Sequence, residues 1–375
     1  MKKIPFNLFL CTIALVLLSQ NAVLAFKQEF SKIIYKEFNI DAYGTTQLIN
    51  KYGKIDAKTW DGNQVKIKVT ILANSNSQKD AEDIFNRIKI DFYNDAKFVK
   101  AETHISESKS SWTNWGWNSG KNNDYSISYE VYFPRGNFLD LTNKYGDSYV
   151  GFTNGAVKAN VKYGNIRMED VNNNAELNIA YGNANLKDIK KELKLNIDYG
   201  KFNAQNIEKA DINGDYAEFE LENVSELKVH SDYATFRLGK IGNLSGEGDY
   251  GHFKIKSVSN ITYNGDYTDV SVGSLENFAD INMDYGSLKI DNVNKNFSEI
   301  RVDADYTDVM IAPESGCDYR LNAASSYAGI KYPSGFNVNY EKEGNTNEKV
   351  EGFMGSKNAR GLIKVNVSYG GLKIR

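Results

Sequence analysis

A tyrosine that returns at a nearly constant interval is the feature that most restricts what this chain can fold into. From Tyr145 to Tyr306, the positions of successive tyrosines differ by 18, 18, 18, 17, 17, 17, 17, 18 and 21. Tyr327 follows after another 21. A period this short predicts one turn of a solenoid per repeat rather than a whole domain. The ten tyrosines are Tyr145, Tyr163, Tyr181, Tyr199, Tyr216, Tyr233, Tyr250, Tyr267, Tyr285 and Tyr306.

Apolar residues alternate on both sides of each tyrosine, which predicts strands with one buried side. After Tyr216, Phe219 and Leu221 follow in one phase, and Leu227 and Val229 lead to the next tyrosine. The phase slips by one residue across the tyrosine. The tyrosine and the small residue after it are therefore predicted to hold a bend, in which glycine supplies a positive φ. A further apolar residue eight positions after the tyrosine closes each repeat.

These patterns predict an all-β fold, a single-stranded parallel β-helix or solenoid with repeats of 17–21 residues, preceded by a small α+β N-terminal cap. Repeats stacked about 4.8 Å apart bring equal side chains into columns. We expect the tyrosines to form such a column inside the solenoid and the acids before them to point outward. Where Gly246, Gly248 and Gly265 replace apolar residues, the core should be thinner or filled by neighbouring rings, and of the two we expect a local narrowing.

The ends of the chain differ from the repeats. Ser77 and Asp80 resemble a helix-capping pair, and Ala81, Ile84 and Phe85 follow at helical spacing. Asn-Lys-Tyr-Gly occurs at 50–53 and again at 143–146, on either side of this helix. Tyr369 is expected to form the last rung. The predicted organisation is a signal peptide at 1–25, a strand-helix-strand cap region at 26–143, β-solenoid repeats at 144–332 and capping strands at 333–375.

The N-terminus indicates export. Lys2 and Lys3 precede an apolar run from 8 to 18, and small residues end at Ala25, as in a cleaved secretory signal. An uncleaved anchor is the alternative, although the run is shorter than the ~20 apolar residues of a bilayer span. We expect the product to be in the periplasm, on the outer membrane surface or outside the cell, without a transmembrane anchor. Cys317 is then the only thiol, so no intramolecular disulfide is expected.

The charge balance argues against a polyanionic partner. The formal net charge is −3, and removal of Lys2 and Lys3 would take it to −5. A mildly acidic protein of this kind gives no electrostatic support for nucleic-acid binding.

Two features are candidates for ligand binding. The segment 110–124 carries three indoles that could stack on a glycan, a peptide or a lipid headgroup; alternatively, they cover the base of the solenoid. The acids before the tyrosines are a candidate cation stripe, or else solvated turn residues. The indoles are Trp112, Trp115 and Trp117, and the stripe comprises Asp215, Asp232, Asp249 and Asp266.

No catalytic constellation is apparent. His104, His230 and His252 have no metal-site spacing, and a nucleophile beside a base cannot be identified. His230 and His252 occupy outward positions and are expected to be exposed polar residues. We expect no catalytic residues, no metal and no cofactor, so the protein is not expected to be an enzyme.

The signal sequence, the Asn-Lys-Tyr-Gly motifs, Trp60-Asp61-Gly62 and the tyrosine repeats together resemble bacterial β-strand-repeat families called "putative adhesin", which are common in Bacteroidota. The resemblance implies an exported, adhesin-like binding or scaffold module whose partner is a glycan or an envelope protein. The alternatives are a polysaccharide-processing β-helix enzyme, whose long loops and basic residues are not evident in these short acidic repeats, and an envelope-stress or signalling accessory protein.

Overall fold

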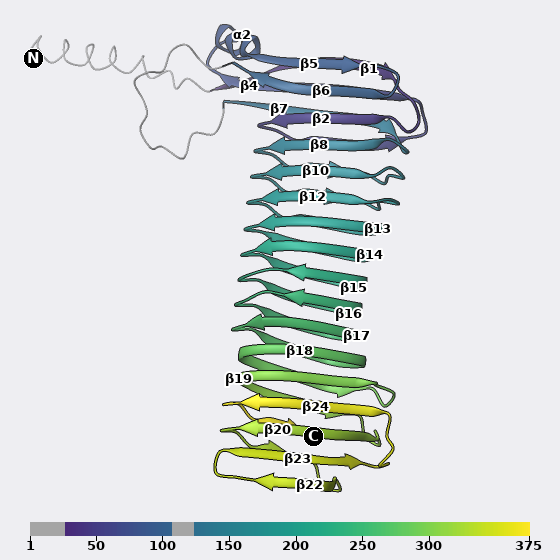
Figure 1. The fold of residues 1–375 in the computed structure, drawn as a ribbon. Helices are drawn as coiled ribbons and strands as arrows, with labels where there is room; N and C mark the ends of the chain where they lie inside the picture. Colours follow the sequence, from purple (N-terminus) through teal and green to yellow (C-terminus); the bar gives the residue numbers. More distant parts are fainter. Residues whose placement is uncertain (1–26, 107–123) are drawn as a thin grey trace, which may run out of the picture.

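The computed structural model describes residues 27–106 and 124–375, and it consists almost entirely of β-strands. The predicted signal segment, 1–25, lies outside the described residues. In Figure 1 the strands lie one above another in a long stack, with the N-terminal strands at one end and the C-terminal strands at the other. The all-β prediction is confirmed.

The N-terminal elements are β1 (Gln28–Asn39), β2 (Thr45–Lys51), β3 (Ile55–Trp60), β4 (Gln64–Ser75), α2 (Gln78–Arg87), β5 (Ile88–Asn94), β6 (Phe98–Ile105) and β7 (Tyr125–Pro134). The strands of the repeats are β8 (Phe138–Lys144), β9 (Ser148–Val150), β10 (Val157–Lys162), β11 (Ile166–Met168), β12 (Ala175–Ala180), β13 (Ala184–Asp198), β14 (Lys201–Asp215), β15 (Glu218–His230), β16 (Thr235–Glu247), β17 (His252–Asp266), β18 (Asp269–Val293) and β19 (Glu299–Pro313). The C-terminal strands are β20 (Tyr319–Ser326), β21 (Ile330–Lys331), β22 (Asn337–Glu343), β23 (Asn347–Met354), β24 (Gly361–Ser368) and β25 (Leu372–Ile374).

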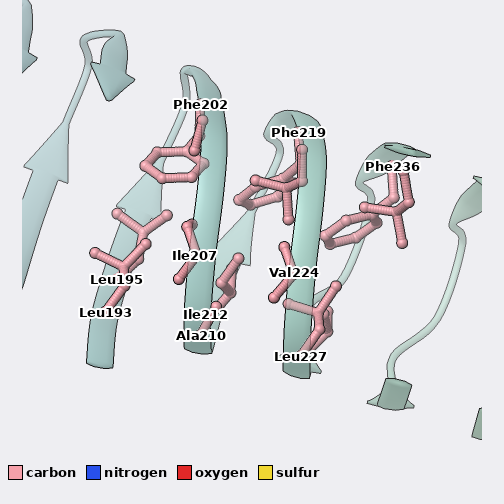
Figure 2. Packing of buried hydrophobic residues seen from close by; sticks show 14 of the residues in the cluster. Leu193, Leu195, Phe202, Ile207, Ala210, Ile212, Phe219, Val224, Leu227 and Phe236 are labelled. Atoms are coloured by element: carbon pink, nitrogen blue, oxygen red, sulfur yellow. The ribbon is translucent and has the colours of Figure 1, made fainter. Parts of the chain in front are cut away.

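The strands of successive repeats pair in parallel, and equivalent residues lie opposite one another. β14 pairs with β15 so that Phe202 lies opposite Phe219. β15 pairs with β16 so that Phe219 lies opposite Phe236. The rings of Phe219 and Phe236 stack with centroids 4.4 Å apart, and Figure 2 shows all three phenylalanines in one column beside a column that contains Ile207 and Val224. The register therefore follows the spacing of the repeat in the sequence.

In the central repeats that begin at Tyr199, Tyr216 and Tyr250, the buried residues lie 3, 5, 8, 11 and 13 positions after the tyrosine. After Tyr216 these residues, each at most 3% exposed, are Phe219, Leu221, Val224, Leu227 and Val229. Two exposed residues separate Leu221 from Val224, and two more separate Val224 from Leu227. Because strict alternation would expose one residue at a time, the paired exposed positions mark two bends in the strand.

The tyrosines do not lie in this interior, so the prediction of a buried tyrosine column is wrong. From Tyr145 onward, twelve of them have 39–61% of their surface exposed. Each adopts a left-handed backbone conformation, with φ between 49° and 62°, which residues other than glycine rarely adopt. The side chain after the tyrosine points inward instead: Ala234 and Thr268 are buried. The aromatic column inside the central repeats is made of phenylalanines.

The glycine after the tyrosine does not supply a positive φ, which corrects a second expectation. Gly182 is needed for space, because a Cβ atom there would lie 1.9 Å from the carbonyl oxygen of Gly164 in the preceding repeat. At Gly251 the nearest atom would be 3.5 Å away. Other repeats carry a larger residue at this position, such as Ala217, which is buried.

A tyrosine outside the ladder fills the part of the core where glycines replace apolar residues, so a neighbouring ring takes the space where we expected a local narrowing. Tyr263 is 2% exposed, and a Cβ atom at Gly246 would lie 2.9 Å from its ring. Its hydroxyl donates a 2.7 Å hydrogen bond to the carbonyl oxygen of Gly248. Burial raises the pKa of Tyr263 to about 12, so the hydroxyl stays protonated.

The N-terminal elements combine parallel and antiparallel pairing. β2 pairs in parallel with β6 and β8, whereas β4 lies antiparallel between β1 and β7. The predicted helix is confirmed as α2, which begins after the N-cap Ser77. The Oγ atom of Ser77 accepts a hydrogen bond from the backbone N–H of Asp80. The Asp80 carboxylate accepts a hydrogen bond from the same hydroxyl, so only half of a capping box is formed.

The end of the chain is inserted between two earlier segments. β24 pairs in parallel with β19 on one side and with β20 on the other. Consequently Tyr369 stacks on both Tyr306 and Tyr327, and it is not the last rung as expected. β22 pairs only with β23, in antiparallel orientation, and all its residues are exposed.

Across residues 27–106 and 124–375, no helix combines the length and the apolar character needed to cross a bilayer.

Candidate functional site: an exposed tyrosine ladder

Thirteen tyrosines form a continuous stack along the outside of the molecule, which we call the tyrosine ladder. Neighbouring rings are nearly parallel, within 9°, and their centroids lie 4.7–5.1 Å apart. Twelve steps of about 4.8 Å make a strip on the order of 60 Å long. In spatial order the ladder is Tyr52, Tyr145, Tyr163, Tyr181, Tyr199, Tyr216, Tyr233, Tyr250, Tyr267, Tyr285, Tyr306, Tyr369 and Tyr327.

The ladder presents ring edges and hydroxyl groups rather than ring faces. Tyr233 stacks on Tyr216 on one side and on Tyr250 on the other, and every inner ring is covered in the same way. Tyr327 has a single stacking partner, and it is the most exposed ring of the ladder at 61%. Partial burial, with neighbouring phenols and carboxylates, raises the pKa of Tyr250 and of Tyr285. The surface is a row of phenol hydroxyl groups that can both donate and accept hydrogen bonds.

The residue before each ladder tyrosine forms a second column, which we call the flanking column. It begins with lysines, whose Nζ atoms lie 4.9–5.4 Å from the centroid of the following tyrosine, within the range of cation–π contacts. It continues with seven consecutive aspartates. In ladder order the column is Lys51, Lys144, Lys162, Ala180, Asp198, Asp215, Asp232, Asp249, Asp266, Asp284, Asp305, Ser368 and Ser326.

The aspartates of the flanking column have a structural role. Oδ1 of Asp215 accepts a 3.1 Å hydrogen bond from the backbone N–H of Asp232. Asp232 accepts one from Asp249, and Asp249 accepts one from Asp266, each at 2.9 Å. Asp215, Asp232 and Asp249 therefore each satisfy a backbone donor beside the tyrosine bend of the next repeat, which favours the turn-residue interpretation for these three over the cation stripe.

The aspartates also repel one another. Burial, together with the charges of Asp249 and Asp284, raises the pKa of Asp266. In the part of the chain that the structure describes, no group of three or more His, Cys, Asp or Glu side chains is arranged to hold a metal ion. The cation stripe formed by Asp215, Asp232, Asp249 and Asp266 stays a prediction.

Rows of asparagines run parallel to the ladder, and they were not among the sequence-based predictions. The amide of Asn178 donates to the side-chain oxygen of Asn160, and Asn196 donates to Asn178. A separate row joins Asn206 and Asn223. The signal is present in the sequence, because each row repeats the same residue at the interval of the tyrosines. Such rows expose further amide groups at the spacing of the ladder.

Shallow hollows lie between these rows. One, of about 420 Å³, extends over the asparagine row beside Lys144 and Lys162. Another, of about 370 Å³, lies at the N-terminal end of the ladder and is lined by Tyr52, Tyr125 and Tyr145. The rings of Tyr125 and Tyr52 meet edge to face, with ring planes at 85°.

The remaining predicted residues have varied outcomes. Trp112, Trp115 and Trp117 lie outside the described residues. His230 and His252 are exposed, as predicted, and lie 2.9 Å from Glu247 and 3.3 Å from Asp269 respectively.

The pairing and the ladder together define an all-β protein of stacked parallel repeats with an aromatic outer edge. The chain belongs to the Toastrack DUF4097 family, whose model matches residues 54–375. No curated protein sequence matches it.

Several solved structures are similar to the chain. One is described as a "putative adhesin" from Parabacteroides distasonis ATCC 8503, with 12% identity, 67% of this chain and 97% of that chain covered, and a TM-score of 0.37. A "putative adhesin" from Parabacteroides merdae ATCC 43184 has 16% identity, coverage of 69% and 96%, and a TM-score of 0.35. A "putative lipid binding protein" from Parabacteroides distasonis ATCC 8503 has 12% identity, coverage of 92% and 97%, and a TM-score of 0.24.

Proposed function

We propose that the protein is an exported β-solenoid that acts as an adhesin-like binding module of the cell envelope and not as an enzyme. The observation that carries this proposal is the tyrosine ladder, a continuous row of exposed aromatic edges and hydroxyls held at a fixed spacing. Tyrosine combines apolar area with a hydrogen-bonding group and loses little conformational entropy when it makes contacts. The export part of the proposal rests on the signal-like residues 1–25.

The chemistry of the ladder face suits a polymer with regularly spaced polar groups, such as a glycan or an extended segment of an envelope protein. Hydroxyls of the ladder and amides of the row Asn160, Asn178 and Asn196 are both donors and acceptors. A rigid, extended face of this kind can accumulate many weak contacts without ordering its own side chains.

Two carboxylates outside the ladder face, Glu169 and Asp188, are unsuited to general-acid catalysis, which supports a role without catalysis. Asp188 lies 2.7 Å from the Nζ atom of Lys190, and Glu169 pairs with Lys187. These lysines lower the pKa of both carboxyls, whereas a general acid in polysaccharide cleavage needs a raised pKa.

The tryptophan segment remains a proposed second contact for the same ligand. Trp112, Trp115 and Trp117 precede β7 in the sequence, and β7 begins with Tyr125 at the N-terminal end of the ladder. A triple alanine variant at the three tryptophans tests this contact separately from the ladder.

The test of the proposed function is binding of the protein without residues 1–25 to a glycan array and to envelope fractions. Tyr181, Tyr199 and Tyr216 are changed together to Phe, which keeps the stack and removes three hydroxyls. The matched control changes Tyr35, Tyr43 and Tyr93 to Phe, because these exposed tyrosines lie outside the ladder. We expect the ladder variant to lose binding and the control to keep it. Equal binding by both variants, or turnover of a polysaccharide in the same assay, would reject the proposal.

A further inference from the structure

Charges on the flanking column are segregated, and they form no ion pairs within the part of the chain that the structure describes. Elsewhere, acids and bases alternate and form ion pairs, for example Lys158 with Glu176 at 2.8 Å. Among the described residues, no flanking-column lysine or aspartate has an oppositely charged side chain within 4.0 Å. Among the described residues, the column therefore carries a positive end and a long negative run, neither of which has an ion-pair partner within the chain.

We propose that the ladder face binds a second copy of this chain, antiparallel, so that the lysine end of each copy meets the aspartate run of the other. A two-fold axis that lies in the interface, along the strands and perpendicular to the ladder, sets each column against the same column in reverse order. If the axis passes through the rung of Asp198, then Lys51, Lys144 and Lys162 face Asp266, Asp249 and Asp232 of the other copy. The two-fold symmetry repeats each of these three lysine–aspartate contacts, so the interface holds every pair twice.

The charges select this register. With the axis at Asp198, only Asp198 opposes its own equivalent, and Ala180 faces Asp215. An axis at Asp232, which would overlap all thirteen rungs, sets Asp215 against Asp249 and Asp198 against Asp266. Like charges brought face to face oppose association. Full overlap is therefore disfavoured. The offset register covers the rungs from Tyr52 to Tyr267, so the second copy competes there with the polymer of the proposed function, and only the four C-terminal rungs stay free for both.

The area of contact is adequate for a specific dimer. The strands beside the ladder present about five residues, or about 16 Å, and nine rungs span about 43 Å. Multiplying this width by this length gives a buried area of about 700 Å² for each copy, which is close to the ~800 Å² per partner of a standard interface. The same operation sets the two ladders against each other, and tyrosine is among the residues that contribute most to interfaces.

Sedimentation velocity of the protein without residues 1–25 tests the dimer. We expect a dimer in about 0.05 M salt that dissociates in about 0.5 M salt, because the pairs lie at the surface, where salt screens them. A monomer at every concentration in low salt would overturn the proposal, and the ladder would then be left to another partner.

A charge swap tests the register. One variant changes Lys51, Lys144 and Lys162 to Glu, and the other changes Asp232, Asp249 and Asp266 to Lys. We expect each alone to be monomeric and an equimolar mixture to restore a dimer, which also shows that both variants are folded. Association of either variant alone to the wild-type extent, or failure of the mixture to associate when both variants unfold cooperatively, would contradict the register.

Cross-linking of the otherwise unaltered protein gives an independent measurement. Asp198→Cys should be joined to its equivalent in the other copy by a bismaleimide with a spacer of about 10 Å, because the residue lies on the proposed axis and the opposed tyrosine rings keep the two backbones beyond the ~7 Å Cα separation that a disulfide allows. Asp284→Cys, in the overhanging part of the same column, is the matched control and should stay monomeric. Cys317 is 3% exposed and should not interfere. Equal cross-linking at both positions would reject the axis at Asp198.

Discussion

The rings of Tyr233 and Tyr250 lie 4.7 Å apart and are parallel within 1°, although a whole repeat separates them in the sequence. The distance matches the separation of neighbouring strands. The backbone N–H of Tyr233 donates to the carbonyl oxygen of Asp249, so the same pairing that builds the sheet fixes the distance between the rings. The exposed ladder is thus a direct product of the repeat and needs no separate folding.

Tyr263 should support the glycine-rich part of the core. Tyr263→Ala removes a buried ring and should lower the free energy of unfolding by about 3–5 kcal/mol. Tyr263→Phe keeps the ring but leaves the Gly248 carbonyl without the hydroxyl donor, which should cost about 1–3 kcal/mol. Urea unfolding followed by circular dichroism measures both. Equal losses in the two variants would show that the ring does not fill this space.

Glycine should be required after the tyrosine only where repeats approach closely. Gly182→Ala places a Cβ atom 1.9 Å from the Gly164 carbonyl oxygen, so the strands must separate and the variant should be destabilised. Gly251→Ala has 3.5 Å of space and should be neutral or slightly stabilising. Thermal melting of the pair checks this difference. A Gly251→Ala variant as unstable as Gly182→Ala would mean that the substitutions act through something other than space.

Two aspartates should respond to pH in opposite directions. The raised pKa of Asp266 means that the folded state holds the proton of this carboxyl more tightly than the unfolded state does. The stability that protonated Asp266 contributes is therefore lost as pH rises above the pKa in the unfolded state, about 3.9. Asp266→Asn should therefore melt above the wild type at pH 7 and equal it at about pH 3. The gain should stay below about 1 kcal/mol, because the group is solvated.

Asp188 should behave in the reverse sense. Its hydrogen bond with Lys190 lowers its pKa, so the stability that it contributes is present above about pH 3.9 and is lost as pH falls through the folded pKa. Asp188→Asn should melt below the wild type at pH 7, and the difference should vanish in acid. Melting curves from pH 3 to 8 compare both variants. Parallel pH profiles for Asp266→Asn and Asp188→Asn would contradict these assignments.

Calcium should not stabilise the flanking column beyond ordinary screening. Oδ1 of Asp215, Asp232 and Asp249 already accepts a backbone N–H, and calcium takes six to eight oxygen ligands. Calcium chloride and sodium chloride at equal ionic strength should raise the melting temperature equally. A larger increase with calcium, abolished by changing Asp215, Asp232, Asp249 and Asp266 to Asn, would establish the cation stripe instead.

The columns of the core could be predicted because the same residue type recurs at the same position. Phe219, Phe236 and Phe253 occupy equivalent positions in consecutive repeats, and parallel pairing sets them over one another. The outward orientation of the tyrosine side chains could not be predicted in the same way. Alternation fixes which residues share a face, but a bend of unknown geometry separates the tyrosine from both strands, and a left-handed tyrosine is unfavourable by local sterics.

Long-range order was also hidden from the sequence. Tyr369-Gly370-Gly371 carries the repeat motif, but the motif alone does not determine which repeats this segment pairs with. The insertion of β24 between β19 and β20 depends on tertiary pairing. The asparagine rows were visible as repeated letters, yet each asparagine alone is typical of a loop.

The orientation of the ladder is the central claim, and one pair of variants tests it most directly. Tyr233 is 49% exposed, and Phe236, further along the same repeat, is 1% exposed. Tyr233→Asp should leave a folded protein that unfolds cooperatively in urea, because the new charge lies in water. Phe236→Asp should abolish the cooperative transition, because an unpaired carboxylate would be buried in the core. A folded Phe236→Asp and an unfolded Tyr233→Asp would place the tyrosines inside and contradict the account.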